Sequence, residues 1–162
     1  MEKKLYTSPL GEIILAAHGG ALIGLWFEGQ KYEQAGLEKL DPAGADPERD
    51  QAVLDKAACW LGKYFAGEAP AVDFAVAPQG TAFQKRVWAA LQAIPYGETV
   101  SYGALAEGLG CRSARAVGAA VGRNPVSVII PCHRVLGSGG ALTGYAGGLE
   151  RKTALLELER NC

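Results

Sequence analysis

The pattern of apolar and polar residues changes in type near the middle of the chain. Apolar runs separated by glycines between residues 5 and 27 predict short strands joined by tight turns. After a polar stretch with prolines and glycine at 41–47, apolar positions recur at helical spacing. This spacing predicts a helix over 51–66 that ends at Gly67. The first half is therefore expected to form an α/β unit.

The second half has the pattern of a separate and mostly helical unit. An alanine- and proline-rich segment at 69–80 is typical of a linker. Thr81 and Gln84 then have the spacing of a capping box, which predicts the start of a helix. We accordingly expect an amino-terminal domain at 1–76 and a carboxy-terminal domain at 77–162.

Two short helical patterns begin near Ser101 and Ser113 and are joined by a glycine-containing turn. This is the pattern of a helix-turn-helix. Small residues occupy every face of the second helix: Ala114, Ala116, Gly118, Ala119, Ala120 and Gly122. Such side chains are poorly suited to reading base edges in a major groove, but they allow close approach to a sugar-phosphate backbone or minor groove. A tightly packed helix pair without a DNA-binding role would also use small residues.

The main candidate for chemistry follows an apolar, β-branched run. The run, Val128–Ile130, predicts a buried strand that ends at Pro131, where the chain is expected to turn, and Cys132 and His133 come directly after that proline. A thiol held at the edge of a core becomes a nucleophile when a base or a positive field favours its thiolate. A small buried cysteine beside a core histidine is the alternative. A glycine-rich loop at 136–148 and a helix at 149–160 complete the predicted elements.

The formal net charge of −1 hides an uneven distribution. Residues 1–73 carry twelve acids and seven bases, whereas residues 74–162 carry nine bases and five acids. The segment from Gly108 to Leu149 contains no acidic residue but has four arginines: Arg112, Arg115, Arg123 and Arg134. A local positive field of this kind suits a phosphate backbone. Ordinary solvated arginines would give the same composition.

The cysteines and histidines favour neither a metal site nor a disulfide framework. Cys59, Cys111, Cys132 and Cys162 show no C-x-x-C spacing, and His18 and His133 are the only histidines. No apolar stretch reaches the length of a membrane span, and no secretory signal follows the first residues. We therefore expect a cytoplasmic, reducing environment.

The sequence Pro131–Val135, PCHRV, resembles the active-site signature of the O6-alkylguanine-DNA alkyltransferases. The resemblance is strong over residues 80–159 and weaker over the amino-terminal part. Flanking motifs agree in order and spacing: Gly80–Gln84, Val87–Trp88, Ile94–Gly97, Ser101–Gly103, Arg115–Gly118, Asn124–Pro125, Thr143–Gly148 and Leu155–Glu159.

The resemblance implies a fold and a reaction. The fold would be an α/β amino-terminal domain of the ribonuclease-H-like type, followed by a mostly α domain with a winged-helix-like helix-turn-helix. The reaction would be irreversible transfer of an alkyl group to Cys132 from O6 of guanine in double-stranded DNA, and also from O4 of thymine. The base would be flipped out of the duplex, no cofactor would be needed, and the protein would act once as a monomer.

The resemblance also implies roles for residues around the thiol. His133 takes the thiol proton through a water molecule, and Glu159 orients the imidazole. Asn124 ties the helix-turn-helix to the active-site turn. Tyr102 crowds the target phosphate and donates a proton to the departing base.

The same resemblance implies DNA and base contacts. Arg115 enters the stack where the guanine departs, and Lys152 has a structural role. The other DNA contacts are Tyr102, Ala114, Ala116, Ala119 and Arg123. The base pocket is implied at Tyr145 and at the backbone of Val135 and Ala146.

Three other classes of protein are compatible with parts of the pattern. A lesion-binding protein without chemistry would keep the fold, but Cys132 argues against it. A helix-turn-helix transcription regulator would need a second helix with larger side chains. A cysteine hydrolase would turn over repeatedly on an activated ester.

Overall fold

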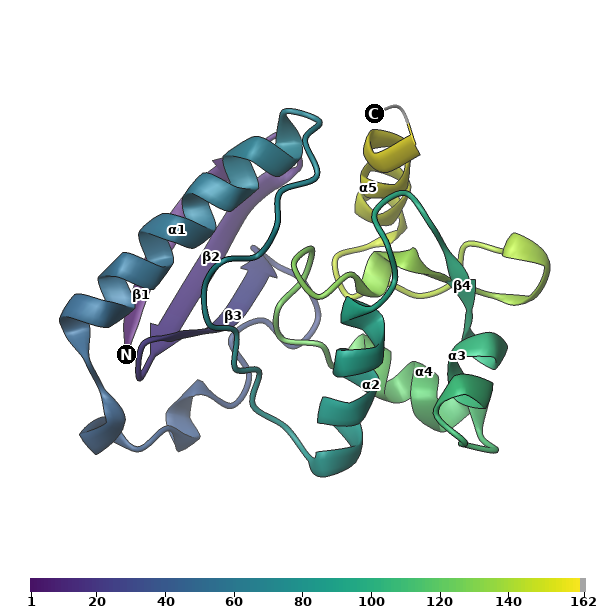
Figure 1. Cartoon of the computed structure of the whole chain (residues 1–162), viewed down its shortest axis with the longest axis horizontal. Helices are drawn as coiled ribbons and strands as arrows, with labels where there is room; N and C mark the ends of the chain where they lie inside the picture. Colours follow the sequence, from purple (N-terminus) through teal and green to yellow (C-terminus); the bar gives the residue numbers. More distant parts are fainter. Residues whose placement is uncertain (161–162) are drawn as a thin grey trace.

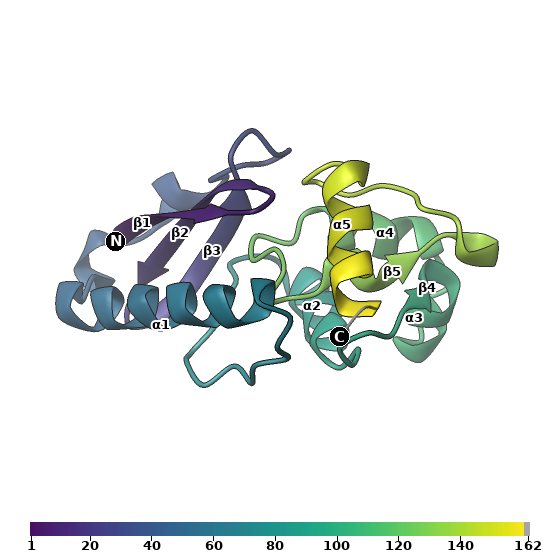
Figure 2. The same cartoon turned by 90° about the horizontal axis from the view of Figure 1, so that it is seen from above.

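The structure, a computed structural model, describes residues 1–160 and places two units side by side (Figure 1). The amino-terminal unit is an antiparallel sheet of order β1-β2-β3, and one long helix runs along a face of this sheet (Figure 2). Its elements are β1 (Glu2–Ser8), β2 (Gly11–His18), β3 (Ala21–Phe27) and α1 (Pro47–Phe65). The predicted α/β unit is confirmed.

The tight turn between β2 and β3 accounts for the two adjacent glycines, Gly19 and Gly20, in the sequence. His18 pairs with Ala21, so only Gly19 and Gly20 form the loop. Both have positive φ, 63° and 82°, as a two-residue turn of this kind requires. The turn also contacts α1, because the Gly20 amide donates to the buried Asp50 carboxylate at 2.6 Å.

Helix α1 begins earlier than the predicted residue 51. Asp46 is its N-cap and accepts from the Arg49 amide at 3.3 Å, and Pro47 occupies the first turn. The expectation placed the start at the first apolar position of the periodic pattern. The cap and the proline precede that position, so the first helical turn was missed.

The carboxy-terminal unit is mostly helical, as predicted. Its elements are α2 (Ala82–Gln92), β4 (Val100–Ser101), α3 (Tyr102–Gly108), α4 (Ala114–Gly122), β5 (Val135–Leu136) and α5 (Leu149–Arg160). The capping box at α2 is confirmed, with Thr81 and Gln84 each accepting from the other's amide. α4 packs against both α2 and α3, and the buried indole of Trp88 donates to the Ala120 carbonyl at 2.9 Å. The pair α3–α4 is the helix-turn-helix.

The two units are joined through the outer strand β3. Leu25 forms a bridge with Val126 from the carboxy-terminal unit. On the same strand Leu22 forms a bridge with Val76, so the segment expected to be a linker is attached to the sheet before it reaches α2. Buried residues of both units accordingly form one continuous apolar cluster.

The buried strand predicted at residues 128–130 is wrong. Val128 has φ 69°, in the left-handed region that a β-branched residue rarely adopts. The chain then folds on itself, because the Ile130 amide donates to the Val126 carbonyl at 3.0 Å. Only β5 is a strand, and it pairs in parallel with β4. A fully buried apolar run has no polar face, so its pattern could not distinguish a strand from a compact turn.

Candidate active site

Cys132 begins a single 3-10 turn, Cys132–Arg134, shortly after the segment 126–130 that folds back on itself. Its side chain is buried, with 5 % of its surface exposed, and it lines a cavity of about 570 Å³, here called the acceptor cavity. The full lining is Lys31, Tyr32, Tyr102, Gly118, Ala119, Val121, Gly122, Arg123, Cys132, Gly144, Tyr145 and Ala146. The thiol is thus held in the core and open to one side, as the sequence predicted.

Asn124 fixes the segment that leads to the thiol. Its Nδ2 donates to the Ile130 carbonyl at 2.8 Å, and its Oδ1 accepts from the Val126 amide at 3.0 Å. Asn124 follows directly after α4 and its C-cap. The side chain therefore ties the helix-turn-helix to the active-site turn, which is the position that the resemblance implied for it.

A buried carboxylate lies behind the turn. Glu159, on α5, accepts from Nε2 of His133 at 2.5 Å and from Nε and Nη2 of Arg134 at 2.7 and 3.1 Å. It also accepts from the Tyr64 hydroxyl at 2.6 Å and from the Gly97 amide at 3.1 Å. Both Glu159 and His133 are almost fully buried. The predicted His133–Glu159 pair is therefore brought together, within a larger network of donors.

The network sets the charges of its members. Burial alone would raise the pKa of Glu159, but hydrogen bonds from His133 and Arg134 outweigh it and hold this pKa well below its usual range. Burial lowers the pKa of His133, and the neighbouring Glu159 offsets only part of this effect. Glu159 is thus ionised and His133 neutral at neutral pH. With Nε2 bonded to the carboxylate, Nδ1 has no hydrogen-bond partner among the described residues.

Cys132 itself is protonated in the resting protein. Burial raises the pKa of its thiol to about 11, although hydrogen bonding to Asn124 and the positive charge of Lys152 act in the opposite direction. At neutral pH the thiolate is therefore a small fraction of the population.

Lys152 holds the glycine-rich loop in front of the thiol. Its buried Nζ donates to the carbonyls of Val135 at 2.7 Å, Thr143 at 2.8 Å and Gly144 at 3.2 Å. The Tyr102 hydroxyl donates to the same Thr143 carbonyl at 3.4 Å. Burial and the nearby Cys132 raise the pKa of Tyr102, so this hydroxyl keeps its proton at neutral pH.

The other predicted site residues fall into two groups. Ala114, Arg115 and Ala116 are exposed at the start of α4 and do not line the acceptor cavity. Exposed Ala119 and Arg123 lie on the same segment but also line the acceptor cavity. Of the three predicted pocket residues, Tyr145 and Ala146 line the cavity, whereas Val135 is fully buried and does not.

Several residues at the site were missed by sequence reasoning. Tyr64 and the pair Lys31–Tyr32 come from the amino-terminal unit, and no local pattern connects them with a thiol far along the chain. Arg134 lies within the PCHRV motif, but the sequence pattern predicts only a contribution of positive charge from it, and not its contact with Glu159. Its guanidinium also donates to the Ile94 carbonyl at 2.7 Å.

Two features considered from the sequence are absent from residues 1–160. No group of three or more His, Cys, Asp or Glu side chains there could hold a metal ion, and none of the described helices is long and apolar enough to cross a membrane. Within this range Cys59, Cys111 and Cys132 are free thiols. Cys162 lies outside the described residues.

We expect Glu159→Gln to lower the free energy of unfolding by about 3–5 kcal/mol at neutral pH, because it leaves the buried Arg134 without a counter-charge. Glu159 has a lowered pKa in the fold, so its contribution is present above about pH 4. That contribution is lost as the pH falls through the folded value. Urea unfolding at several pH values measures both effects. Glu157→Gln, exposed on the same helix, is the matched control, and equal losses in both variants would contradict the prediction.

We expect the rate of alkylation of Cys132 by iodoacetamide to rise about tenfold per pH unit from neutral pH and to level off near pH 11, where half of the thiol is ionised. Quantifying the labelled peptide that contains Cys132 measures this rate. A plateau near pH 8.5, the value for an unperturbed thiol, would show that burial does not control the thiolate.

Two family models match the chain. Residues 1–78 match the 6-O-methylguanine DNA methyltransferase, ribonuclease-like domain, and residues 82–161 match the 6-O-methylguanine DNA methyltransferase, DNA binding domain. The methylated-DNA–protein-cysteine methyltransferase of Mycobacterium tuberculosis is 47% identical over 155 residues, which are 95% of this chain and 89% of that protein. The protein of the same name from Methanosarcina acetivorans is 44% identical over 161 residues, 98% of this chain and 97% of the relative.

Solved structures agree with these matches. The Mycobacterium tuberculosis OGT, crystallised in complex with DNA, superimposes with a TM-score of 0.84 at 44% identity, covering 99% of this chain and 94% of that one. The O6-methylguanine DNA methyltransferase of Methanococcus jannaschii gives a TM-score of 0.67 at 30% identity, covering 97% and 93%. The two halves of the sequence match the two domains of one family, and the whole fold matches its solved structures. This chain therefore belongs to the 6-O-methylguanine DNA methyltransferase family.

Proposed function

We propose that this protein repairs DNA by transferring the alkyl group from O6 of guanine to the sulfur of Cys132. The observation that carries the proposal is the buried thiol at the wall of the acceptor cavity, with a histidine–carboxylate pair behind it. The thiolate attacks the alkyl carbon and forms a carbon–sulfur bond. The bond between that carbon and O6 breaks, its electron pair goes to the guanine, and the guanine takes a proton.

The arrangement supplies a base for the thiol proton. Glu159 holds the Nε2–H of neutral His133, which leaves Nδ1 as the acceptor. A water molecule relays the proton from Cys132 to this nitrogen. The imidazolium that forms lies against the ionised Glu159, which stabilises it as the carboxylate does in a nucleophile–base–orienter triad. A thiol with a pKa of about 11 thus becomes reactive when a substrate is in place to receive its electrons.

Tyr102 is suited to protonate the departing guanine. Its ring lines the acceptor cavity beside Cys132, and its raised pKa keeps the hydroxyl protonated. Tyr145 and Ala146 also line the cavity, and the Tyr145 side chain and the Ala146 backbone would receive the flipped base. A contact between the flipped base and the backbone of Val135 remains a prediction. The carbonyl of Val135 already accepts a hydrogen bond from Lys152.

The exposed start of α4 is the proposed DNA surface. Ala114, Ala116 and Ala119 are small and exposed, so the helix can approach the minor groove closely. Arg115 between them would occupy the space that the guanine leaves. Arg123, at the rim of the acceptor cavity, would contact the phosphate backbone.

The product determines the number of turnovers. A thioether is chemically stable, and no second cysteine stands in C-x-x-C spacing to release the alkyl group. The alkyl group comes from the lesion, so the reaction consumes no cofactor. We propose one transfer per molecule, by a monomer in the cytoplasm, with O4-alkylthymine as a second substrate.

We expect repair of an O6-methylguanine oligonucleotide to stop at one lesion per protein molecule. Intact-mass measurement should show one methyl group gained, located on the peptide that contains Cys132. Cys132→Ser should bind DNA and transfer nothing, because a hydroxyl is far less available as an anion. Cys59→Ser, exposed on α1, is the matched control and should transfer normally. Product formation beyond one equivalent would rule out the single-turnover mechanism.

We expect Arg115→Ala to slow repair in duplex DNA on the order of tenfold or more, because extruding a base costs a few kcal/mol that the arginine partly offsets. The effect should be smaller in a single strand and smallest with free O6-benzylguanine, which needs no extrusion. Single-turnover rates at saturating DNA measure all three. Arg112→Ala removes a neighbouring exposed charge and is the control for a phosphate contact. If duplex and free-base rates fall by the same factor in Arg115→Ala, the arginine has no role in extrusion.

A further inference from the structure

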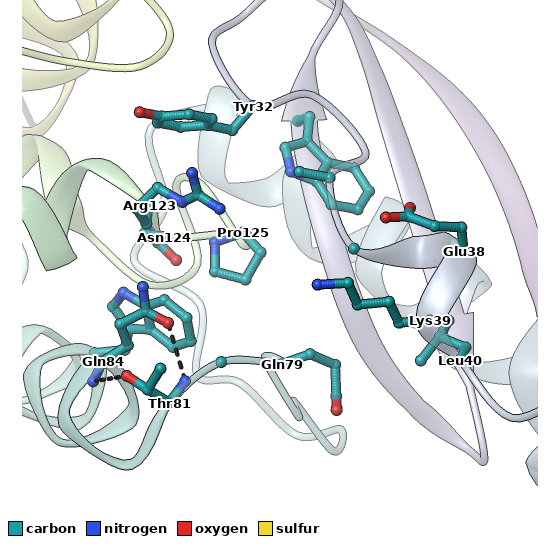
Figure 3. Close-up of a pocket in the computed structure, with 15 residues that line it drawn as sticks. Tyr32, Glu38, Lys39, Leu40, Gln79, Thr81, Gln84, Arg123, Asn124 and Pro125 are labelled. Carbon is teal, nitrogen blue, oxygen red and sulfur yellow. Dashed lines mark hydrogen bonds between the residues drawn. The ribbon is translucent and has the colours of Figure 1, made fainter.

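A second cavity lies next to the acceptor cavity. It has a volume of about 640 Å³ and lies between the sheet, the segment that follows β3, and the start of α2 (Figure 3). Its lining includes Leu40 and the polar side chains of Lys39, Gln79 and Gln84, while the neighbouring indoles of Trp26 and Trp88 are only 2 % and 1 % exposed. The lining thus combines apolar and hydrogen-bonding groups.

Among the described residues, only Tyr32 and Arg123 line both cavities. The guanidinium carbon of Arg123 lies 4.0 Å from the centre of the Tyr32 ring, and Figure 3 shows the two side chains next to each other at the edge of the second cavity. Lys31 adds its ammonium 5.1 Å from the same ring. A single stacked contact, here called the Tyr32–Arg123 pair, therefore separates the two spaces.

The position of Tyr32 does not follow from packing in the core. Its side chain is exposed, and its φ of 63° lies in the left-handed region, as does the φ of 55° at Gln34. Backbone strain of this kind persists where the surroundings hold it, and it is concentrated at functional sites. The neighbouring Lys31 amide donates to the carbonyl of Ala146, a lining residue of the acceptor cavity, at 3.1 Å. The segment is thus attached to the acceptor cavity, with Tyr32 directed at Arg123.

The strength of the pair suits a barrier that can open. A cation–π contact at an exposed site changes an equilibrium only about two- to fivefold. Tyr32 comes from the segment after β3, whereas Arg123 caps the end of α4. The pair can therefore separate without disturbing the buried network behind Cys132.

We infer that the Tyr32–Arg123 pair sets the size of the O6 substituent that the protein accepts. Small alkyl groups react with the pair closed. Substituents with two aromatic rings react when the pair separates, so that the outer ring enters the second cavity. The inference rests on the proposed alkyl transfer to Cys132 and deepens it by naming a specificity-determining contact and a class of bulky aryl substrates.

The test compares two free bases, O6-benzylguanine and O6-(4-phenylbenzyl)guanine, so that DNA contacts do not contribute. Second-order rate constants for alkylation of Cys132 are measured by intact mass. Tyr32→Gly keeps the positive φ without strain. It should raise the rate constant for the larger substrate, relative to that for the smaller, by about two- to fivefold. Tyr32→Phe retains the ring and should keep the parent ratio. Arg123→Leu opens the contact from the other side and should raise the ratio as Tyr32→Gly does.

A blocking variant identifies where the outer ring goes. Ala35 lines only the second cavity, so Ala35→Trp in the Tyr32→Gly background should remove the gain for the larger substrate and leave O6-benzylguanine unaffected. Thermal unfolding shows that each variant is folded. A ratio that does not change in Tyr32→Gly or Arg123→Leu, or a gain that survives Ala35→Trp, would overturn the inference. Failure of the parent protein to take a methyl group from O6-methylguanine DNA would instead overturn the proposed function.

Discussion

The arrangement of the active site depends on one buried charge, the carboxylate of Glu159. Burial of an ion is unfavourable unless donors surround it, and here Tyr64, Gly97, His133 and Arg134 all donate to it. These donors come from α1, the loop after α2 and the active-site turn, and α5 supplies the acceptor. Satisfying one carboxylate therefore fixes the relative positions of four separate segments.

This constraint explains how a turn can hold a nucleophile without a sheet around it. The segment before Cys132 contains a residue with positive φ, Val128, and would be a poor support by itself. Asn124 bonds its backbone from the side of α4, and the Glu159 network holds the residues that follow. In front of the thiol, Lys152 donates to the Val135 carbonyl in β5 and to two carbonyls of the glycine-rich loop. The sulfur is thus fixed from behind, and its open side is bounded by a loop with few side chains.

The features that sequence predicted well are those that depend on neighbours in the chain. The capping box at Thr81, the two short helices and α5 follow from local spacing and were found. The apolar, β-branched run before Cys132 predicts a strand, but a run without polar positions has no spacing that could distinguish a strand from a compact turn. The roles of Tyr64 and Tyr32 could not be predicted, because they depend on contacts across the two units. The PCHRV motif located the thiol through resemblance, while composition alone left its reactivity open.

The same contacts show that the amino-terminal unit is part of the active site. A boundary between residues 76 and 77 separates two sequence patterns, but residues on its two sides contact each other around the active site. Tyr64 reaches the carboxylate that orients His133, and β3 pairs with Val126 just before the active-site turn. The acceptor cavity itself is closed on one side by Lys31 and Tyr32. The carboxy-terminal unit carries every group that takes part in the proposed chemistry, and the amino-terminal unit determines where those groups lie and which substituents can reach them.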